Sequence, residues 1–139
     1  MTKHERIEKL LKPLFDDCDG KMVPASEELL AKFRQQATAR NVPDTVIEEL
    51  TEFYKVSNGV VPCLNGFGIN ACDDEILYEW WDEYNVLWLG DCNDEVLRWS
   101  NGKYCLGDAS NDSYGDEYEF STLVELIECT FEECKILEY

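Results

Sequence analysis

The twelve residues from Asp108 to Glu119 have the acidic spacing of a calcium-binding loop. Oxygen-bearing side chains occupy the first, third, fifth, ninth and twelfth places, as in an EF-hand: Asp108, Ser110, Asp112, Asp116 and Glu119. The sixth place needs glycine for a sharp turn and is Ser113, and the flanks are typical of strands rather than helices. The pattern therefore favours a solvated acidic loop, and a calcium-dependent protein stays open as an alternative.

The remaining reactive side chains do not form a catalytic pattern. His4 is the single histidine, in a charged amino-terminal turn, whereas a catalytic cysteine or serine needs a histidine beside it. The seven cysteines include no C-x-x-C pair, which argues against a zinc ribbon or a thioredoxin-type site. Glycine-rich nucleotide-binding and H-E-x-x-H motifs are also absent from the sequence. We therefore predict no enzyme, no catalytic residue, no metal and no cofactor.

A tandem tryptophan pair lies among acids. Trp80 and Trp81 are flanked by Glu79, Asp82 and Glu83. Adjacent side chains point about 100° apart on a helix and to opposite faces on a strand, so both rings are difficult to bury together. Exposed tryptophan with a polar rim is typical of a binding hot spot. The alternative is that both rings pack at the edge of the core, because tryptophan is mostly buried in proteins.

The charge of the chain is strongly negative and uneven. The 139 residues carry 30 acidic and 12 basic side chains, a formal net charge of -18. Residues 1–59 contribute -2 of this charge and residues 60–139 contribute -16. Nucleic-acid binding uses a basic surface, so direct binding of DNA or RNA is disfavoured. The acids serve either to keep the protein soluble or to bind a cationic protein.

The composition is that of a globular protein, with 45% hydrophobic and 30% charged residues. The length is close to that of one domain, so we expect residues 1–139 to form a single domain. No apolar run approaches the ~18 residues that span a bilayer, and the amino terminus lacks the apolar region of a signal peptide. The odd cysteine count without a secretion signal favours reduced thiols, and we expect a cytoplasmic protein without a membrane partner.

The first third of the chain has helical periodicity. Thr2 and Glu5 form a capping box before a first helix, which Pro13 is expected to end or kink. Ser26 is the expected N-cap of a second helix. A third helix is predicted over about 44–57, with a left-handed C-cap at Asn58-Gly59.

The rest of the chain is dominated by strand signals. Short strands are expected over 66–71 and 86–89, the second ended by Gly90-Asp91. Residues 73–84 are expected to form a short helix or turn. Asn101-Gly102 lies between two further apolar runs, which is a strong hairpin signal. Ser121 is expected to cap a last helix with apolar residues at helical spacing. Consecutive strands favour an antiparallel sheet, hence an α+β fold.

Several of these segments together resemble the SUKH superfamily, the Smi/Knr type. The run from Val42-Pro43-Asp44 to Phe53-Tyr54 and Asn58-Gly59 is similar to its "LP…FY…NG" signature. The strand at 87–90, the hairpin at Asn101-Gly102 and the helix at 120–127 are similar to later parts of that family. The likeness covers about residues 26–135. It departs from the family at Leu126, where an aromatic residue is frequent, and in the tryptophan pair and cysteine count.

The resemblance implies an α+β fold with a mostly antiparallel mixed sheet packed by helices. Many bacterial members are immunity proteins that bind and neutralise a cognate toxin, often a nuclease or deaminase. The charge favours the same function, because an acidic protein can occupy the cationic cleft of a nuclease. The alternative is an intracellular regulatory or scaffold module without a toxin partner; the sequence does not give the oligomeric state. The predicted partner-binding residues are Trp80, Trp81, Asp82, Glu83, Asp91, Asp94, Asp112 and Asp116.

Overall fold

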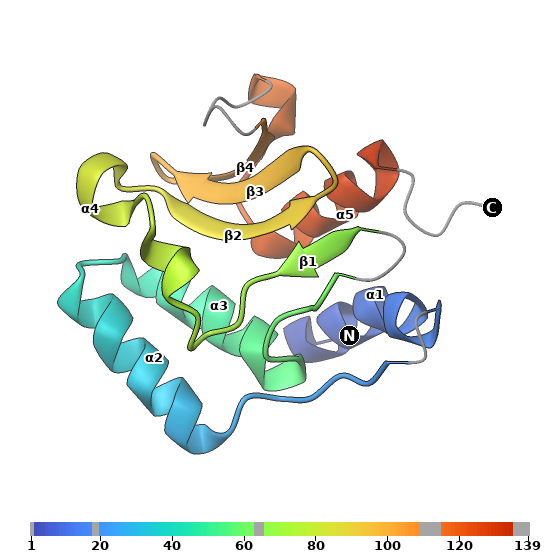
Figure 1. Ribbon diagram of the computed structural model, residues 1–139, viewed down its shortest axis with the longest axis horizontal. Coiled ribbons are helices and arrows are strands. Elements are labelled where there is room, and N and C mark those ends of the chain that lie inside the picture. The colour runs from blue at the N-terminus through green and yellow to red at the C-terminus, as the bar shows by residue number, and fades with distance from the viewer. Residues whose placement is uncertain (1, 18–19, 63–65, 109–114, 135–139) are drawn as a thin grey trace. The chain divides into compact units, whose positions relative to one another are not determined.

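The computed structural model describes residues 2–17, 20–62, 66–108 and 115–134 (Figure 1). These residues form five α-helices and a five-stranded antiparallel sheet, which confirms the α+β class. Their contacts divide the chain into two compact units. We call residues 1–59 with 71–73 the helical unit, and residues 60–70 with 74–139 the sheet unit.

The helical unit consists of α1 (Lys3–Asp17), α2 (Glu27–Ala39) and α3 (Asp44–Val56). Both predicted caps are confirmed: the Glu5 amide donates to Thr2 Oγ1 at 3.1 Å, and the Leu29 amide donates to Ser26 Oγ at 3.1 Å. The apolar faces of the three helices supply its buried core, which includes Ile7, Leu11, Leu14, Leu30, Phe33, Ala37, Val46, Ile47, Leu50, Phe53 and Tyr54. In this core the Tyr54 ring packs edge-on against both Phe33 and Phe53.

The helix ends differ from the predictions in two details. Of the two outcomes expected at Pro13, an end or a kink, the end does not occur, because α1 continues to Asp17 with the proline inside it. Asn58 does not cap α3 with its backbone, since Ser57 ends that helix in an extended conformation. Gly59 does adopt the expected positive φ, of 84°.

The Asn58 side chain instead forms hydrogen bonds to the segment 71–73, the second part of the chain that belongs to the helical unit. Its Oδ1 accepts from the Cys72 amide at 2.9 Å, and its Nδ2 donates to Asp73 Oδ1 at 3.4 Å. The Cys72 thiol is buried there, and burial together with the Asp73 charge raises its pKa to about 11. This cysteine is therefore a small core residue rather than a nucleophile.

The sheet unit contains five strands in consecutive order: β1 (Phe67–Ile69), β2 (Leu87–Cys92), β3 (Glu95–Ser100), β4 (Lys103–Gly107) and β5 (Glu119–Phe120). Every pair is antiparallel, so the described sheet is not mixed. The Asn101-Gly102 hairpin is confirmed, with φ of 52° and 81° at the two turn residues.

The strand β2 is longer than predicted. It does not end at Gly90-Asp91 but continues to Cys92, with an irregularity in its pairing to β3 between Trp88 and Gly90. The short helices η1 (Glu75–Tyr78) and α4 (Trp81–Tyr84) precede it, as expected for residues 73–84.

The last helix of the sheet unit is α5 (Leu123–Glu133), which contacts β4 and β5. Thr122 rather than Ser121 is its N-cap, and accepts from the Glu125 amide at 3.3 Å. The apolar face of α5 includes Leu123, Leu126 and Ile127, all buried, and the Phe131 ring packs edge-on against Phe67 of β1.

Candidate protein-binding surface

The tandem tryptophans separate into two environments because they stand at the start of α4. Trp81 is the first residue of this helix; it is only 6% exposed and packs at a tilt against Trp99 of β3. Trp80 precedes the helix and remains half-buried. The prediction of Trp81 as a partner anchor is therefore corrected, because its ring belongs to the core of the sheet unit.

Trp80 stacks on Trp88, a strand residue that is not among the predicted partner-binding residues. The two ring centroids are 4.3 Å apart and the planes differ by 2°. The Arg98 guanidinium carbon lies 5.8 Å from the Trp80 centroid, within the range of a cation–π contact. Trp88 and Arg98 are direct partners across β2 and β3, which places their side chains on the same face of the sheet.

Arg98 is a structural cation rather than a surface charge. It is only 1% exposed, and its Nη2 donates to the main-chain carbonyl of Asp108. Its charge also opposes the increase that burial causes in the pKa of the Cys105 thiol, its partner on β4. The alternation of side chains along a strand predicts on which face of the sheet Arg98 lies. It does not predict that the Arg98 side chain is buried on that face.

Asp91 orients Trp88. Its Oδ1 accepts from the Trp88 indole Nε1 at 3.1 Å. Partial burial raises the pKa of Asp91, and the hydrogen bond from Trp88 opposes that increase. Asp91 was predicted to bind the partner, but its half-buried carboxylate already has an acceptor role within the sheet unit.

The exposed part of this region is the helix α4 itself. Asp82 and Glu83 are exposed, and the Tyr84 side chain is 60% exposed. The Tyr84 amide donates to the Trp80 carbonyl at 3.1 Å, which holds these residues one turn from the tryptophan. We call Trp80, Asp82, Glu83, Tyr84 and Trp88 the α4 ridge. Tyr84 follows the acids directly, but its exposure could not be deduced without knowing which helix face is buried.

The other predicted acids are not gathered at the α4 ridge. Asp94 is exposed in the turn after β2. This turn lies at the opposite end of β2 from α4 (Figure 1). A six-residue separation along a strand is about 20 Å. Asp116 begins the short helix η2 (Asp116–Tyr118), and Asp112 lies outside the described residues. The predicted set is thus divided into separate locations.

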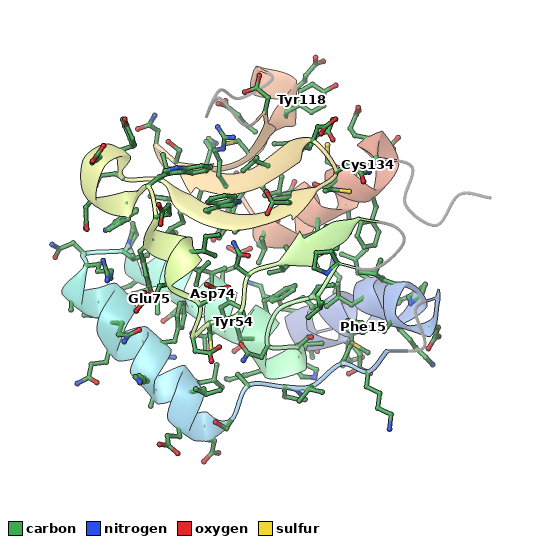
Figure 2. All side chains as sticks on the ribbon, viewed as in Figure 1. Phe15, Tyr54, Asp74, Glu75, Tyr118 and Cys134 are labelled. Carbon is green, nitrogen blue, oxygen red and sulfur yellow. The ribbon has the colours of Figure 1, made fainter. Side chains whose placement is uncertain are left out.

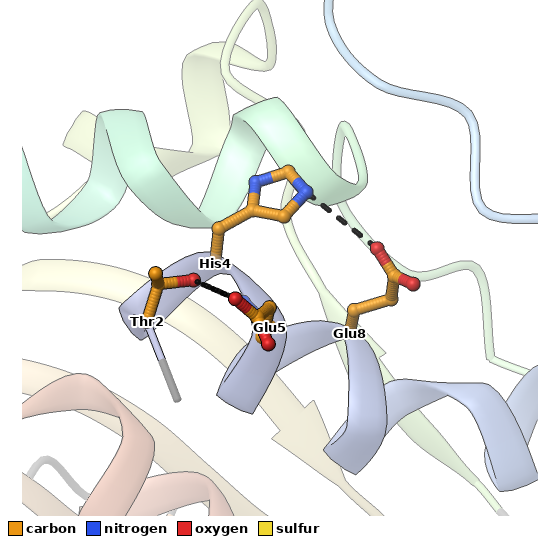
Figure 3. Close-up of polar contacts among 4 residues, drawn as sticks. All are labelled: Thr2, His4, Glu5 and Glu8. Atoms are coloured by element: carbon orange, nitrogen blue, oxygen red, sulfur yellow. Dashed lines mark hydrogen bonds and ion pairs between the residues drawn. The ribbon is translucent and has the colours of Figure 1, made fainter.

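The single histidine of the chain is placed in the first helix. His4 lies on α1, where its Nε2 is 3.5 Å from Glu8 Oε2 (Figure 3). Thr2 and Glu5, also in that figure, form the capping box of the same helix. Over residues 2–17, 20–62, 66–108 and 115–134, no three His, Cys, Asp or Glu side chains are placed to hold a metal ion.

A scan against models of protein families found no match to this chain, and searches of curated proteins and of solved structures found none either. The resemblance to the SUKH superfamily therefore stays a prediction. No helix among the described residues has the length and apolar character needed to cross a membrane.

Proposed function

We propose that this chain is a non-enzymatic binding protein that neutralises a cationic toxin domain of the nuclease or deaminase type. The observation that carries the proposal is the α4 ridge, where an exposed tyrosine and two exposed carboxylates lie within one helical turn of a half-buried tryptophan that stacks on a second one. Aromatic side chains with a polar rim are characteristic of hot spots in protein interfaces. The resemblance to SUKH immunity proteins supports the same function.

The ridge offers two kinds of contact to an arginine or lysine of the partner. Asp82 and Glu83 can each accept charge-assisted hydrogen bonds from a guanidinium group. The ring of Tyr84 can bind the same type of cation over its face. A toxin that binds phosphates must concentrate such cations in its cleft, so occupying them excludes its substrate.

The charge around the ridge favours rapid association with a cationic surface. Within the described part of the sheet unit, Lys103 is the exposed basic side chain, and Arg98 is buried. Exposed acids are far more numerous there: Asp74, Glu75, Glu79, Asp82, Glu83, Asp94, Glu117, Glu125, Glu128, Glu132 and Glu133. A field of one sign steers an oppositely charged partner and accelerates its binding, in a manner that salt weakens.

The compartment proposed for this interaction is the cytoplasm. The described cysteines, Cys72, Cys92, Cys105, Cys129 and Cys134, are free thiols. Free thiols are usual where glutathione and thioredoxin maintain reducing conditions.

The test uses the purified full chain and the toxin domain encoded beside its gene. Tyr84→Ala should weaken binding by about 30-fold, the loss typical of an interface hot spot. The double variant Asp82→Asn/Glu83→Gln should slow association by about tenfold, and added salt should reduce that difference. Both quantities can be measured by surface plasmon resonance over a series of salt concentrations.

The matched control is Asp94→Asn/Glu117→Gln, which removes the same charge from exposed positions outside α4. It should slow association less than the α4 double variant does. Equal effects of the two double variants would show that net charge alone acts and would reject the α4 ridge. Absence of a complex would reject the toxin partner, and an adjacent gene that encodes no toxin would favour the regulatory alternative.

A further inference from the structure

Two cysteines that are 42 positions apart in the sequence meet inside the sheet unit. Cys92 is the last residue of β2 and is completely buried. Cys134 follows the last turn of α5 and is half-buried (Figure 2). The Cys134 Sγ lies 3.8 Å from the main-chain oxygen of Cys92 and 3.6 Å from Glu95 Oε2.

The two thiols also influence each other's ionisation. The neighbouring Cys134 thiol lowers the pKa of Cys92 below its ordinary value. Cys92 in turn raises the pKa of Cys134, and burial and the Glu95 carboxylate add to that increase. The Cys134 Sγ already contacts the main chain of Cys92, so the two cysteines lie on neighbouring parts of the backbone.

The backbone on both sides of this thiol pair is fixed. Cys92 is paired with Phe67 of β1 and with Glu95 of β3. The Cys134 amide donates to the Thr130 carbonyl at 2.9 Å, and Phe131, in the preceding turn, packs against Phe67. Because a disulfide forms only between cysteines whose backbones are already close, this fixed proximity is the requirement for a bond.

We propose that Cys92 and Cys134 form a reversible oxidation site, at which hydrogen peroxide or an organic hydroperoxide converts the thiol pair into an intramolecular disulfide. A thiolate of this pair attacks the peroxide, so that an S–O bond forms, the O–O bond breaks and water or an alcohol leaves. The other sulfur of the pair then attacks the sulfenic sulfur, so that the S–S bond forms and the sulfenic oxygen leaves as water. Two thiols are oxidised and one peroxide is reduced.

The bond would have a defined structural effect. It would join the end of α5 to the end of β2 and close a large loop of the chain, and such loops lose entropy in the unfolded state. We therefore expect the oxidised protein to melt at a higher temperature than the reduced protein, and a dithiol reductant to abolish the difference. This effect is independent of the function proposed for the α4 ridge.

The test treats the reduced full chain with hydrogen peroxide, blocks the remaining thiols with iodoacetamide and maps the peptides by mass spectrometry without reduction. We expect a peptide pair linked through Cys92 and Cys134, with the mass of two hydrogen atoms lost, that dithiothreitol separates. Cys134→Ser should abolish this link, whereas Cys129→Ser, the matched change on α5, should retain it.

Peptide mapping of the unsubstituted chain gives a result that does not depend on the folding of either variant. A reproducible link between Cys92 and Cys134, together with a reductant-sensitive increase in melting temperature, would support the oxidation site. Cross-links that instead join Cys134 to another cysteine, or irreversible oxidation of Cys134 with Cys92 still alkylated, would overturn it.

Discussion

At the scale of single residues, two glycines show that the same residue type serves different physical needs. Gly90 lies in β2, where a Cβ atom would come 2.1 Å from the Gly68 carbonyl oxygen and 3.0 Å from the Ile69 Cα. Gly102 has no atom within 4 Å of that position, but its φ is 81°. The first glycine is needed for close approach of two backbones, and the second for a left-handed turn.

Replacing these glycines should therefore have unequal costs. Gly90→Ala must push β1 away from β2, and we expect it to lower the free energy of unfolding by about 3 kcal/mol. Gly102→Ala meets only the left-handed backbone penalty, about 1 kcal/mol. Urea unfolding of both variants measures the difference. An equal or larger loss at Gly102 would contradict the close approach of β1 and β2.

At the scale of elements, α1 contains a residue that weakens it. Pro13 lies inside this helix and is exposed, so its ring contributes little burial, while its missing amide removes a bond to the Lys9 carbonyl. We expect Pro13→Ala to raise the free energy of unfolding by about 1–2 kcal/mol, since alanine favours helix interiors strongly over proline. Thermal unfolding followed by circular dichroism measures the change. Lys12→Ala, at the neighbouring exposed position, is the control and should alter stability by less than about 0.5 kcal/mol.

The acids near the end of α5 also have consequences for that element. Glu133 raises the pKa of the Tyr118 hydroxyl, since its charge opposes formation of a phenolate. Glu132 and Glu133 are in the last turn of α5, which contains no basic residue, although the helix dipole favours cations at that end. The arrangement is electrostatically unfavourable within the isolated chain.

At the scale of the whole molecule, the net charge of -18 should destabilise the folded chain through self-repulsion. Raising sodium chloride from about 0.05 M to about 0.5 M shortens the screening length to a few ångströms. We therefore expect the melting temperature to increase over this range, as measured by calorimetry. Potassium chloride at the same ionic strength should give the same increase. A constant or falling melting temperature would show that the acids do not repel one another appreciably.

The sequence by itself determined the features that depend on near neighbours along the chain. The caps at Thr2 and Ser26, a helix over about 44–57 and the Asn101-Gly102 hairpin were predicted, because each is specified by periodicity or by a few adjacent residues. These elements in order were enough to predict the α+β class. Local signals were less accurate at Pro13 and Gly90, where contacts elsewhere in the structure outweigh the intrinsic preference of the residue.

Only the tertiary structure decided which of the chemically notable side chains come together. It placed Trp80 on Trp88, buried Trp81, and separated Asp94 from α4 along the length of β2. It also brought Cys92 to Cys134. Each of these outcomes depends on strand register or on packing between distant segments. A pattern of neighbouring residues carries no information on such pairings, because they form only when the strands pair with one another and α5 packs against the sheet.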